Sequence, residues 1–379
     1  MFGKKPVNPD RRCGVVIDIG SASVAIGIVV SDADAPAPEL IWSNVERCPI
    51  AEELNLSELS KRVTTTLANN MLTLGSAGLT ALADFDSTLT IQSCDVTVSA
   101  PWTYTVPKRI HATFDEPTEI TKKLVADLVK TAEDSIMQTF GNNDVFAELG
   151  LTRINSDTTS FTLNGYTVRE PYGHEVTDLA LTRLVSVCQK RLFDAISETH
   201  DKIIPKSKLR VGAFMSQLHH SPITATTGQK TYGLIDASGE AIEVGIVIDS
   251  HLSSVMHVVW GHYAAARSIR ITTQEPLESA LARLKNSDTI TPAHAQYSSK
   301  LLEAISRAAM QSELPSHFYV HCETGYHELV TRIAEKALAL LGAHAPSVSI
   351  ISAKVLPHIE IEESRLALSL AVFHTAPIE

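Results

Sequence analysis

Asp18 ends an apolar stretch of the chain and is followed closely by Gly20 and Ser21, a combination that can bind a phosphate group. Glycine has no Cβ, so the backbone N–H groups of such a turn can approach a phosphate closely, and the serine hydroxyl adds another donor. The carboxylate can hold a hydrated Mg²⁺, which prefers one or two carboxylates together with phosphate oxygens. A plain hairpin whose glycine serves only the turn explains these residues equally well.

A similar pattern returns in the second half of the chain, where Asp236 ends another apolar stretch and Ser238 and Gly239 follow it. Two copies of strand, aspartate, turn and strand predict a duplicated α/β domain. In open sheets of this kind the ligand cleft lies at the strand ends, where the two copies meet. A phosphate-binding turn on each side of one cleft is far more specific than either turn alone.

The elements that would position these turns follow from the periodicity of the apolar residues. The turns join strands predicted at 14–19 and 24–30 and at 232–237 and 241–248. Further strands are predicted at 39–43, 94–101, 110–114, 145–154, 160–164, 175–187, 209–214, 257–261 and 318–322. Helices are predicted at 55–72, 124–136, 189–199, 276–285, 298–313 and 328–341. The stretch from 92 to 187 therefore forms a module of its own.

The composition is that of a globular protein, because 44% of the 379 residues are hydrophobic and 20% are charged. The formal net charge of −11 argues against binding to nucleic acid or to an anionic membrane surface. No apolar run reaches the length of a membrane-spanning helix, and no secretory signal opens the chain. The five cysteines are widely spaced, which fits a reducing cytoplasm and argues against a metal centre built on them.

The motif Asp18-Ile19-Gly20-Ser21-Ala22-Ser23 resembles the first phosphate motif of the FtsA and PilM branch of the actin-like ATPase superfamily. Leu163-Asn164-Gly165-Tyr166 and Glu170-Pro171-Tyr172-Gly173 resemble a connection in the small inserted domain, called SHS2, that this branch carries. Met1-Phe2-Gly3-Lys4-Lys5 is similar to the first residues of many members of the PilM group. The resemblance implies a duplicated actin-like (ribonuclease H-like) α/β fold with an inserted α+β SHS2 domain.

The same resemblance implies where the domains begin and end. Residues 1–13 are expected to be a flexible N-terminus, and residues 14–91 together with 188–230 the first actin-like domain. Residues 92–187 would be the inserted SHS2 domain. Residues 231–379 would be the second actin-like domain, with a helical subdomain at about 275–315.

The resemblance also implies ATP and Mg²⁺ as cofactors at the two turns. The candidate nucleotide-binding residues are Asp18, Gly20, Ser21, Ala22, Ser23, Ser238, Gly239, Gly261, Thr324 and Gly325. Asp18 and Asp236 are the candidate Mg²⁺ ligands. Asp236 is also the best candidate for a catalytic residue that binds the metal or a water, and a carboxylate that only caps a turn is the alternative.

Several positions depart from the pattern of the family. Ser238 stands where the second phosphate turn has a glycine, and Glu240 places a carboxylate that repels phosphate oxygens unless it binds the metal. The interdomain Gly-Gly of the family is reduced to Gly261-His262, and the segment 322–326 has one glycine instead of two or three. We therefore expect weak or degenerate ATP binding and at most a weak ATPase activity.

Three functions are compatible with this resemblance. The first is a cytoplasmic scaffold, peripheral at the inner face of the membrane through a partner, that binds the cytoplasmic tail of an inner-membrane protein in type IV pilus or secretion machinery. Trp102, Tyr104 and Ile110 are the candidate contacts, although Trp102 is better explained as an edge-strand aromatic.

The second function is an FtsA-like division protein that links a filament to the membrane. The chain ends without the basic amphipathic helix typical of FtsA, which disfavours this alternative. The third is an active ATPase or small-molecule kinase. Self-association into filaments is compatible with the resemblance, whereas nucleic-acid binding and direct membrane insertion are not expected.

Overall fold

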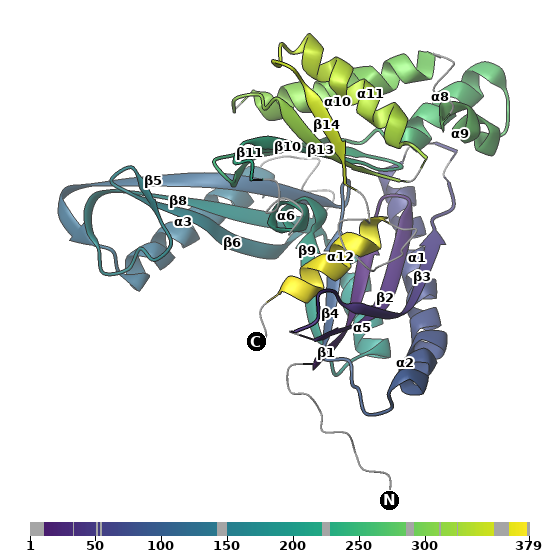
Figure 1. Cartoon of the computed structure of the whole chain (residues 1–379), viewed down its shortest axis with the longest axis horizontal. Coiled ribbons are helices and arrows are strands. Elements are labelled where there is room, and N and C mark those ends of the chain that lie inside the picture. Colours follow the sequence, from purple (N-terminus) through teal and green to yellow (C-terminus); the bar gives the residue numbers. More distant parts are fainter. Residues whose placement is uncertain are drawn as a thin grey trace, which may run out of the picture.

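The computed structural model describes residues 11–376 apart from positions 33, 51, 54, 311 and 324 and segments 142–149, 222–227, 286–291 and 352–363. These residues form three β-sheets, two of which lie in separate helix-covered domains (Figure 1). Thr324 and residues 1–10 of the expected flexible N-terminus lie outside the described residues.

The first sheet has the strand order β3-β2-β1-β4-β9. Its strands are β1 (Arg11–Ile19), β2 (Ser23–Asp32), β3 (Glu39–Arg47), β4 (Ser93–Val98) and β9 (Lys208–Ala213). Apolar side chains of helices α1 (Leu56–Thr73) and α5 (Lys190–Ile203) share one core with this sheet. A π-helix turn (Leu74–Gly78) joins α1 to α2 (Leu79–Phe85). We call this unit domain I.

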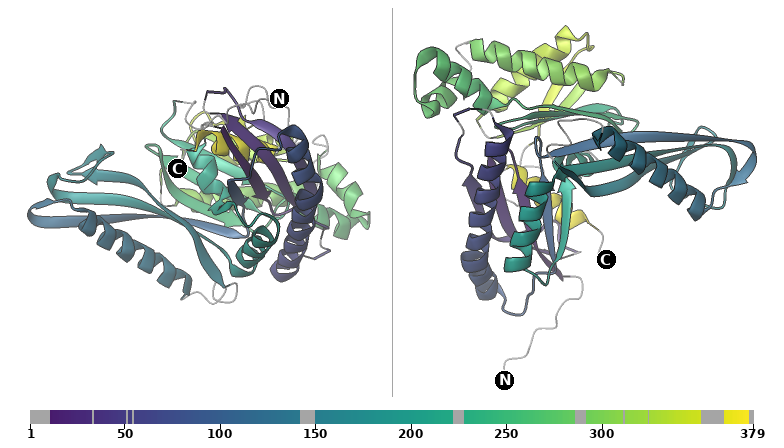
Figure 2. Two further views of the ribbon diagram at one scale, coloured as in Figure 1. Left: turned by 90° about the horizontal axis from the view of Figure 1, so that it is seen from below. Right: turned by 180° about the vertical axis from the view of Figure 1, so that it is seen from behind.

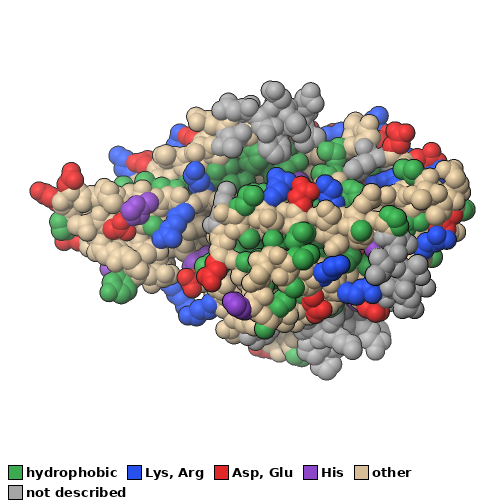
Figure 3. All heavy atoms as spheres, turned by 90° about the horizontal axis from the view of Figure 1, so that it is seen from above, with side chains coloured by type: hydrophobic (Ala, Val, Ile, Leu, Met, Phe, Trp, Pro, Cys, Tyr) green, Lys and Arg blue, Asp and Glu red, His purple; other side chains and the backbone are tan. Residues whose placement is uncertain are grey.

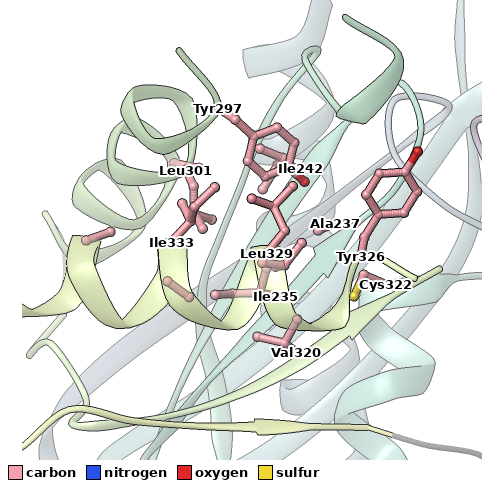
Figure 4. Close-up of a cluster of buried hydrophobic side chains, with 14 of the residues drawn as sticks. Ile235, Ala237, Ile242, Tyr297, Leu301, Val320, Cys322, Tyr326, Leu329 and Ile333 are labelled. Carbon is pink, nitrogen blue, oxygen red and sulfur yellow. The ribbon is translucent and has the colours of Figure 1, made fainter. Parts of the chain in front are cut away.

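The second sheet has the order β12-β11-β10-β13-β14. Its strands are β10 (Tyr232–Ala237), β11 (Ile242–Ile248), β12 (His251–Val258), β13 (His317–Cys322) and β14 (Ser347–Ile350). The helices α8 (His262–Thr273), α9 (Leu277–Lys285), α10 (Pro292–Ala309) and α11 (His327–Leu340) complete domain II. Side chains of α10 and α11 pack on the sheet around Ile235 and Val320 (Figure 4).

The central strands of the two sheets repeat each other. β1 lies between the antiparallel β2 and the parallel β4, and β10 lies between the antiparallel β11 and the parallel β13. Asp18 is the residue before the last of β1 and pairs with Thr97, while Asp236 is the residue before the last of β10 and pairs with His321. The predicted duplication is confirmed, and both aspartates occupy the same place in their copy.

The third sheet, with the order β5-β8-β6-β7, lies in sequence between β4 and β9 and projects to one side of both domains (Figures 1 and 2). Its strands are β5 (Thr103–Glu119), β6 (Leu151–Leu163), β7 (Tyr166–Val168) and β8 (Glu175–Gln189), and helix α3 (Lys122–Gly141) packs on it. We call residues 103–189 the inserted module. Asn164 and Gly165 have φ values of 48° and 86°, so the predicted turn between β6 and β7 is confirmed.

Several predicted elements differ from the structure. The strands predicted at 145–154 and 160–164 are one strand, β6, because the polar residues between them stay hydrogen-bonded to β8 through two irregularities in register. The strand predicted at 257–261 is β12, which ends at Val258. The helices α6 (Phe214–His220) and α8 were not predicted, because α8 contains β-branched residues and only a short alanine run.

The last helix, α12 (Ser364–Thr375), returns to domain I and covers the face of its sheet opposite α1. Leu366, Leu370 and Phe373 pack against the apolar side chains of β1 and β2. The guanidinium of Arg12 donates to the carbonyl oxygens of Phe373, His374 and Ala376 at 2.9 to 3.0 Å, and so caps the helix. The expected range of the second domain, 231–379, therefore contributes a helix to the first.

Phe373→Ala is expected to lower the free energy of unfolding by about 3 kcal/mol, because the ring is buried on the sheet and its loss leaves a cavity. Leu340→Ala is the control, since this α11 side chain is 65% exposed and its loss is expected to cost less than about 0.5 kcal/mol. Urea unfolding measures both changes. Equal changes for the two variants would contradict the docking of α12.

Candidate functional site

The turn after β1 is held in place by its neighbours. The N–H of Gly20 donates to the carbonyl of Ser23 at 2.9 Å, which closes the turn. The indole N–H of Trp102 donates to the carbonyl of Gly20 at 3.0 Å, and Trp102 itself is completely buried. This turn, which we call turn I (Gly20 to Ala22), therefore has a fixed shape and is bonded to the residue directly before the inserted module.

The turn after β10, which we call turn II (Ser238 to Glu240), is closed in a similar way. The N–H and the hydroxyl of Ser238 both donate to the carbonyl of Ala241, at 2.9 and 3.0 Å. The N–H of Tyr263 in α8 donates to the carbonyl of Gly239 at 2.8 Å. Gly261 has to be glycine, because a Cβ there would overlap the carbonyl oxygens of turn II.

Turn I and turn II touch each other directly. The hydroxyl oxygens of Ser21 and Ser238 are 2.9 Å apart, and the N–H of Glu240 donates to the Ser21 hydroxyl oxygen, also at 2.9 Å. A Cβ built on Gly239 would lie only 2.5 Å from the Cβ of Ala22. The structure thus brings together the predicted residues of both turns, but it leaves no phosphate-sized space between them.

The two aspartates lie behind the turns. Asp18 and Asp236 are both 1% exposed. The carboxylate of Asp236 accepts a hydrogen bond from Nδ1 of the buried His321 at 2.8 Å, and the His321 ring packs on Phe214. Among the described residues, no three His, Cys, Asp or Glu side chains are grouped so that they could hold a metal ion. Asp236 therefore has a protein partner where a metal or water ligand was expected.

Glu240 has a partner that the sequence analysis missed. Its carboxylate accepts two hydrogen bonds from the guanidinium of Arg267 in α8, at 2.9 and 2.5 Å, and both residues are buried. This is a bidentate ion pair, the strongest geometry available to arginine and a carboxylate. The only signal in the sequence is a lone arginine after three alanines in a stretch that was not predicted to be helical.

Aromatic rings lie at the other end of the site, around the segment 322–326. The ring of His262 is stacked on that of Tyr326 at 4.1 Å, and Nε2 of His262 lies 3.2 Å from a carboxylate oxygen of Glu323. Tyr326 is buried at the carboxyl end of β13, beside Cys322 (Figure 4). Burial raises the pKa of Tyr326, and the nearby Glu323 raises it further. Gly325 has the left-handed φ of 95°, so it serves the turn into α11.

These residues do not fit ATP and Mg²⁺ in this arrangement. The N–H of Glu240, which would donate to a phosphate, already donates to Ser21. The carboxylate of Glu240 would face the phosphates, and Arg267 neutralises it instead of a metal ion. The rings of His262 and Tyr326 are stacked on each other at the other end of the candidate site. The candidate site is therefore an interface between the domains.

The three candidate partner contacts lie on or beside β5. Trp102 is buried and bonded to turn I. The ring of Tyr104 lies between Phe140 of α3 and His257 of β12, at 6.3 and 4.6 Å, so it joins the inserted module to domain II. Ile110 is half-buried against the core of the inserted module. In this conformation the first two residues pack the domains together instead of facing a partner.

A cavity of about 500 Å³ lies elsewhere, between domain I and the inserted module. Ile154 and Asn155 of β6 form one wall, and Leu209 to Gly212 of β9 form another. Phe193 of α5 and the end of α12 close it. Arg210 in this cavity donates to the Asp95 carboxylate at 2.5 and 3.0 Å. The sequence analysis did not identify this cavity, because its walls are far apart in the chain.

Arg267→Met is expected to lower the free energy of unfolding by about 3 to 5 kcal/mol, because it leaves the Glu240 carboxylate buried without its ion pair. The double variant Glu240→Leu/Arg267→Met is expected to recover most of this loss, since no charge is then buried. Arg270→Met, one turn further along α8 and exposed, is the control and should cost less than about 1 kcal/mol. Chemical denaturation measures all three, and a mild effect of Arg267→Met would contradict the pair.

Comparisons with known proteins agree on the fold. A scan against protein-family models gives no match, and neither does a sequence search of the curated proteins. Among solved structures, a PilM-PilN type IV pilus biogenesis complex is similar with a TM-score of 0.58 at 12% identity, covering 96% of this chain and 99% of that chain. The ethanolamine utilization protein EutJ from Carboxydothermus hydrogenoformans has a TM-score of 0.45 at 10% identity, covering 97% and 92%.

A protein of Bacteroides thetaiotaomicron with an actin-like ATPase fold has a TM-score of 0.43 at 9% identity, covering 97% of this chain and 99% of that chain. At such low identities only the fold is comparable. Three observations indicate the same fold. They are the sheet order, the duplication around Asp18 and Asp236, and the match to the PilM-PilN complex over 96% of this chain. This chain has the duplicated fold of the actin-like ATPases.

Proposed function

We propose that this chain is an actin-like scaffold that binds the cytoplasmic tail of an inner-membrane protein in type IV pilus or secretion machinery. The observation that carries the proposal is the cavity between domain I and the inserted module. The likeness in fold to a PilM-PilN pilus biogenesis complex supports a partner of this kind. Together with the closed turns, the cavity favours a binding protein over an enzyme.

The position of β9 suits an extended peptide. β9 is the last strand of the first sheet in the described part of the chain, so no further strand of that sheet pairs with its outer edge. A strand edge without a paired neighbour can bind an extended segment through main-chain hydrogen bonds. The cavity lies along this edge, with residues 209–212 of β9 in its wall.

The side chains of the cavity suit a tail with apolar residues. Phe193, Leu209 and Val211 present apolar surface, and the ion pair of Arg210 with Asp95 adds a polar position. An extended peptide presents side chains to one face at every second residue, so we expect apolar residues at alternating positions of the tail. Apolar contacts would then give affinity, and the ion pair would select the register.

The surface charge supports a protein partner over a nucleic acid. On the face shown in Figure 3, Lys and Arg side chains are interspersed with Asp and Glu side chains, without a large basic patch. The formal net charge is −11. A surface of this kind does not attract a phosphate backbone.

We place the scaffold at the cytoplasmic face of the inner membrane, held there by its partner.

Membrane contact in this proposal comes from the partner. No helix in the described ranges is long and apolar enough to cross a bilayer.

We further propose that the inserted module is an SHS2 domain, with residues 14–91 and 188–230 as the first actin-like domain. No arrangement of the described residues favours filament formation, a division role or kinase activity, so these are not part of the proposal.

ATP and Mg²⁺ enter this proposal only as weak ligands. Asp18 and Asp236 are the two carboxylates that could meet the metal, but Asp236 is bonded to His321. Ser21 and Ser238 are bonded to each other. We therefore propose degenerate nucleotide binding and, at most, a weak ATPase.

Asn155→Trp is expected to weaken binding of the tail at least about tenfold, because the indole would fill the cavity beside β9. The probes are synthetic peptides that match the cytoplasmic tails of inner-membrane proteins encoded beside this gene, and fluorescence anisotropy measures their affinity. Thr167→Trp, exposed on β7 of the same sheet and away from the cavity, is the control and should bind like the wild type. The proposal fails if no tail binds, or if both variants bind equally well.

A further inference from the structure

Turn I and turn II belong to different domains, and direct hydrogen bonds join them. We propose that Ser21, Ser238, Glu240 and Arg267 form an interdomain latch that holds the two actin-like domains closed in the absence of nucleotide. This inference goes beyond the proposed function, because it concerns what fixes the domains and not what the scaffold binds. It rests on hydrogen bonds, packing and burial at one place.

The hydrogen bonds of the latch have one consistent direction. The hydroxyl of Ser238 donates to the carbonyl of Ala241, so its oxygen is left to accept the hydroxyl hydrogen of Ser21. The oxygen of Ser21 in turn accepts the N–H of Glu240. Both serines therefore donate and accept at once, and hydrogen bonds in such a buried chain polarise and strengthen one another.

Arg267 fixes turn II from behind. Its two hydrogen bonds to the Glu240 carboxylate tie the turn to α8, at the same residue whose N–H reaches Ser21. The pair is 1% and 7% exposed, so water does not compete for it. A protein carboxylate and guanidinium thus replace the opposite charges that a phosphate and a metal ion would bring to this place.

Packing closes the space around these bonds. The close approach of Gly239 to Ala22 brings the backbones of the two turns together, and only glycine permits it. On one side His262 and Tyr326 are stacked and buried. Opening the domains would break both hydrogen bonds of Ser21 at the same time.

Two further contacts cross the domain boundary away from the turns. At the rim, Arg270 of α8 lies 3.4 Å from the Glu52 carboxylate in domain I. At the inserted module, Tyr104 packs on His257 of β12. These contacts flank the latch, so the closed arrangement is supported at three places. Nucleotide is then not needed to set the angle between the domains. Binding of a partner at the cavity is therefore independent of nucleotide.

A distance measurement between the domains tests the latch. All five native cysteines are buried, so the double variant Lys61→Cys/Lys336→Cys can be spin-labelled selectively on the exposed faces of α1 and α11. Pulsed electron paramagnetic resonance is recorded without nucleotide, with ATP and Mg²⁺, and with a non-hydrolysable ATP analogue and Mg²⁺. We expect one narrow distance distribution that is the same in all three samples.

Ser21→Ala in the labelled protein is expected to broaden this distribution, because the N–H of Glu240 loses its acceptor. Hydrogen exchange at the Glu240 amide should become roughly fivefold faster or more, as the loss of one hydrogen bond predicts. Ser23→Ala, two residues along and outside the latch, is the matched control and should leave both readings unchanged. Ser21→Ala removes one oxygen from a turn, so it is expected to lower the free energy of unfolding less than a variant of Arg267 does.

Two results would overturn the latch. One is a second, longer distance in the nucleotide-free wild type, or a saturable change of distance with either nucleotide. The other is a Ser21→Ala variant whose distance distribution and exchange match those of the wild type. Neither measurement uses a tail peptide, so a failure of the proposed partner binding leaves this test unaffected.

Discussion

The direct contact between turn I and turn II is the constraint on which the rest of this structure depends. The two copies of the α/β unit face each other through the turns at the ends of their central strands. The hydroxyl of Ser21 and the N–H of Glu240 set the distance between these turns. The buried ion pair of Glu240 with Arg267 then holds turn II in the position from which the N–H of Glu240 reaches the Ser21 hydroxyl oxygen.

Glycines make the contact possible, and they do so for steric reasons. Gly239 brings turn II against turn I, and Gly261 lets the start of α8 reach the carbonyls of turn II. Both residues were predicted to contact a nucleotide. In the structure their freedom from a Cβ serves the approach of protein to protein.

The inserted module belongs to both parts of the molecule. Trp102, directly before the module, donates to turn I. Tyr104 packs on domain II, and β6 forms a wall of the cavity beside β9. The module is therefore anchored close to turn I and to domain II, and the same anchoring shapes the cavity.

The sequence by itself determined the duplicated fold, because alternating apolar runs that end in Asp18 and Asp236 specify buried central strands by local periodicity. It also located the turns and the positions that depart from the family pattern, among them Glu240. It could not find the partner of Glu240, since Arg267 lies on an unpredicted helix and only packing brings the two together. The cavity was likewise decided by tertiary structure alone, because its walls come from segments that share no local pattern, and proximity in space is the one property that unites them.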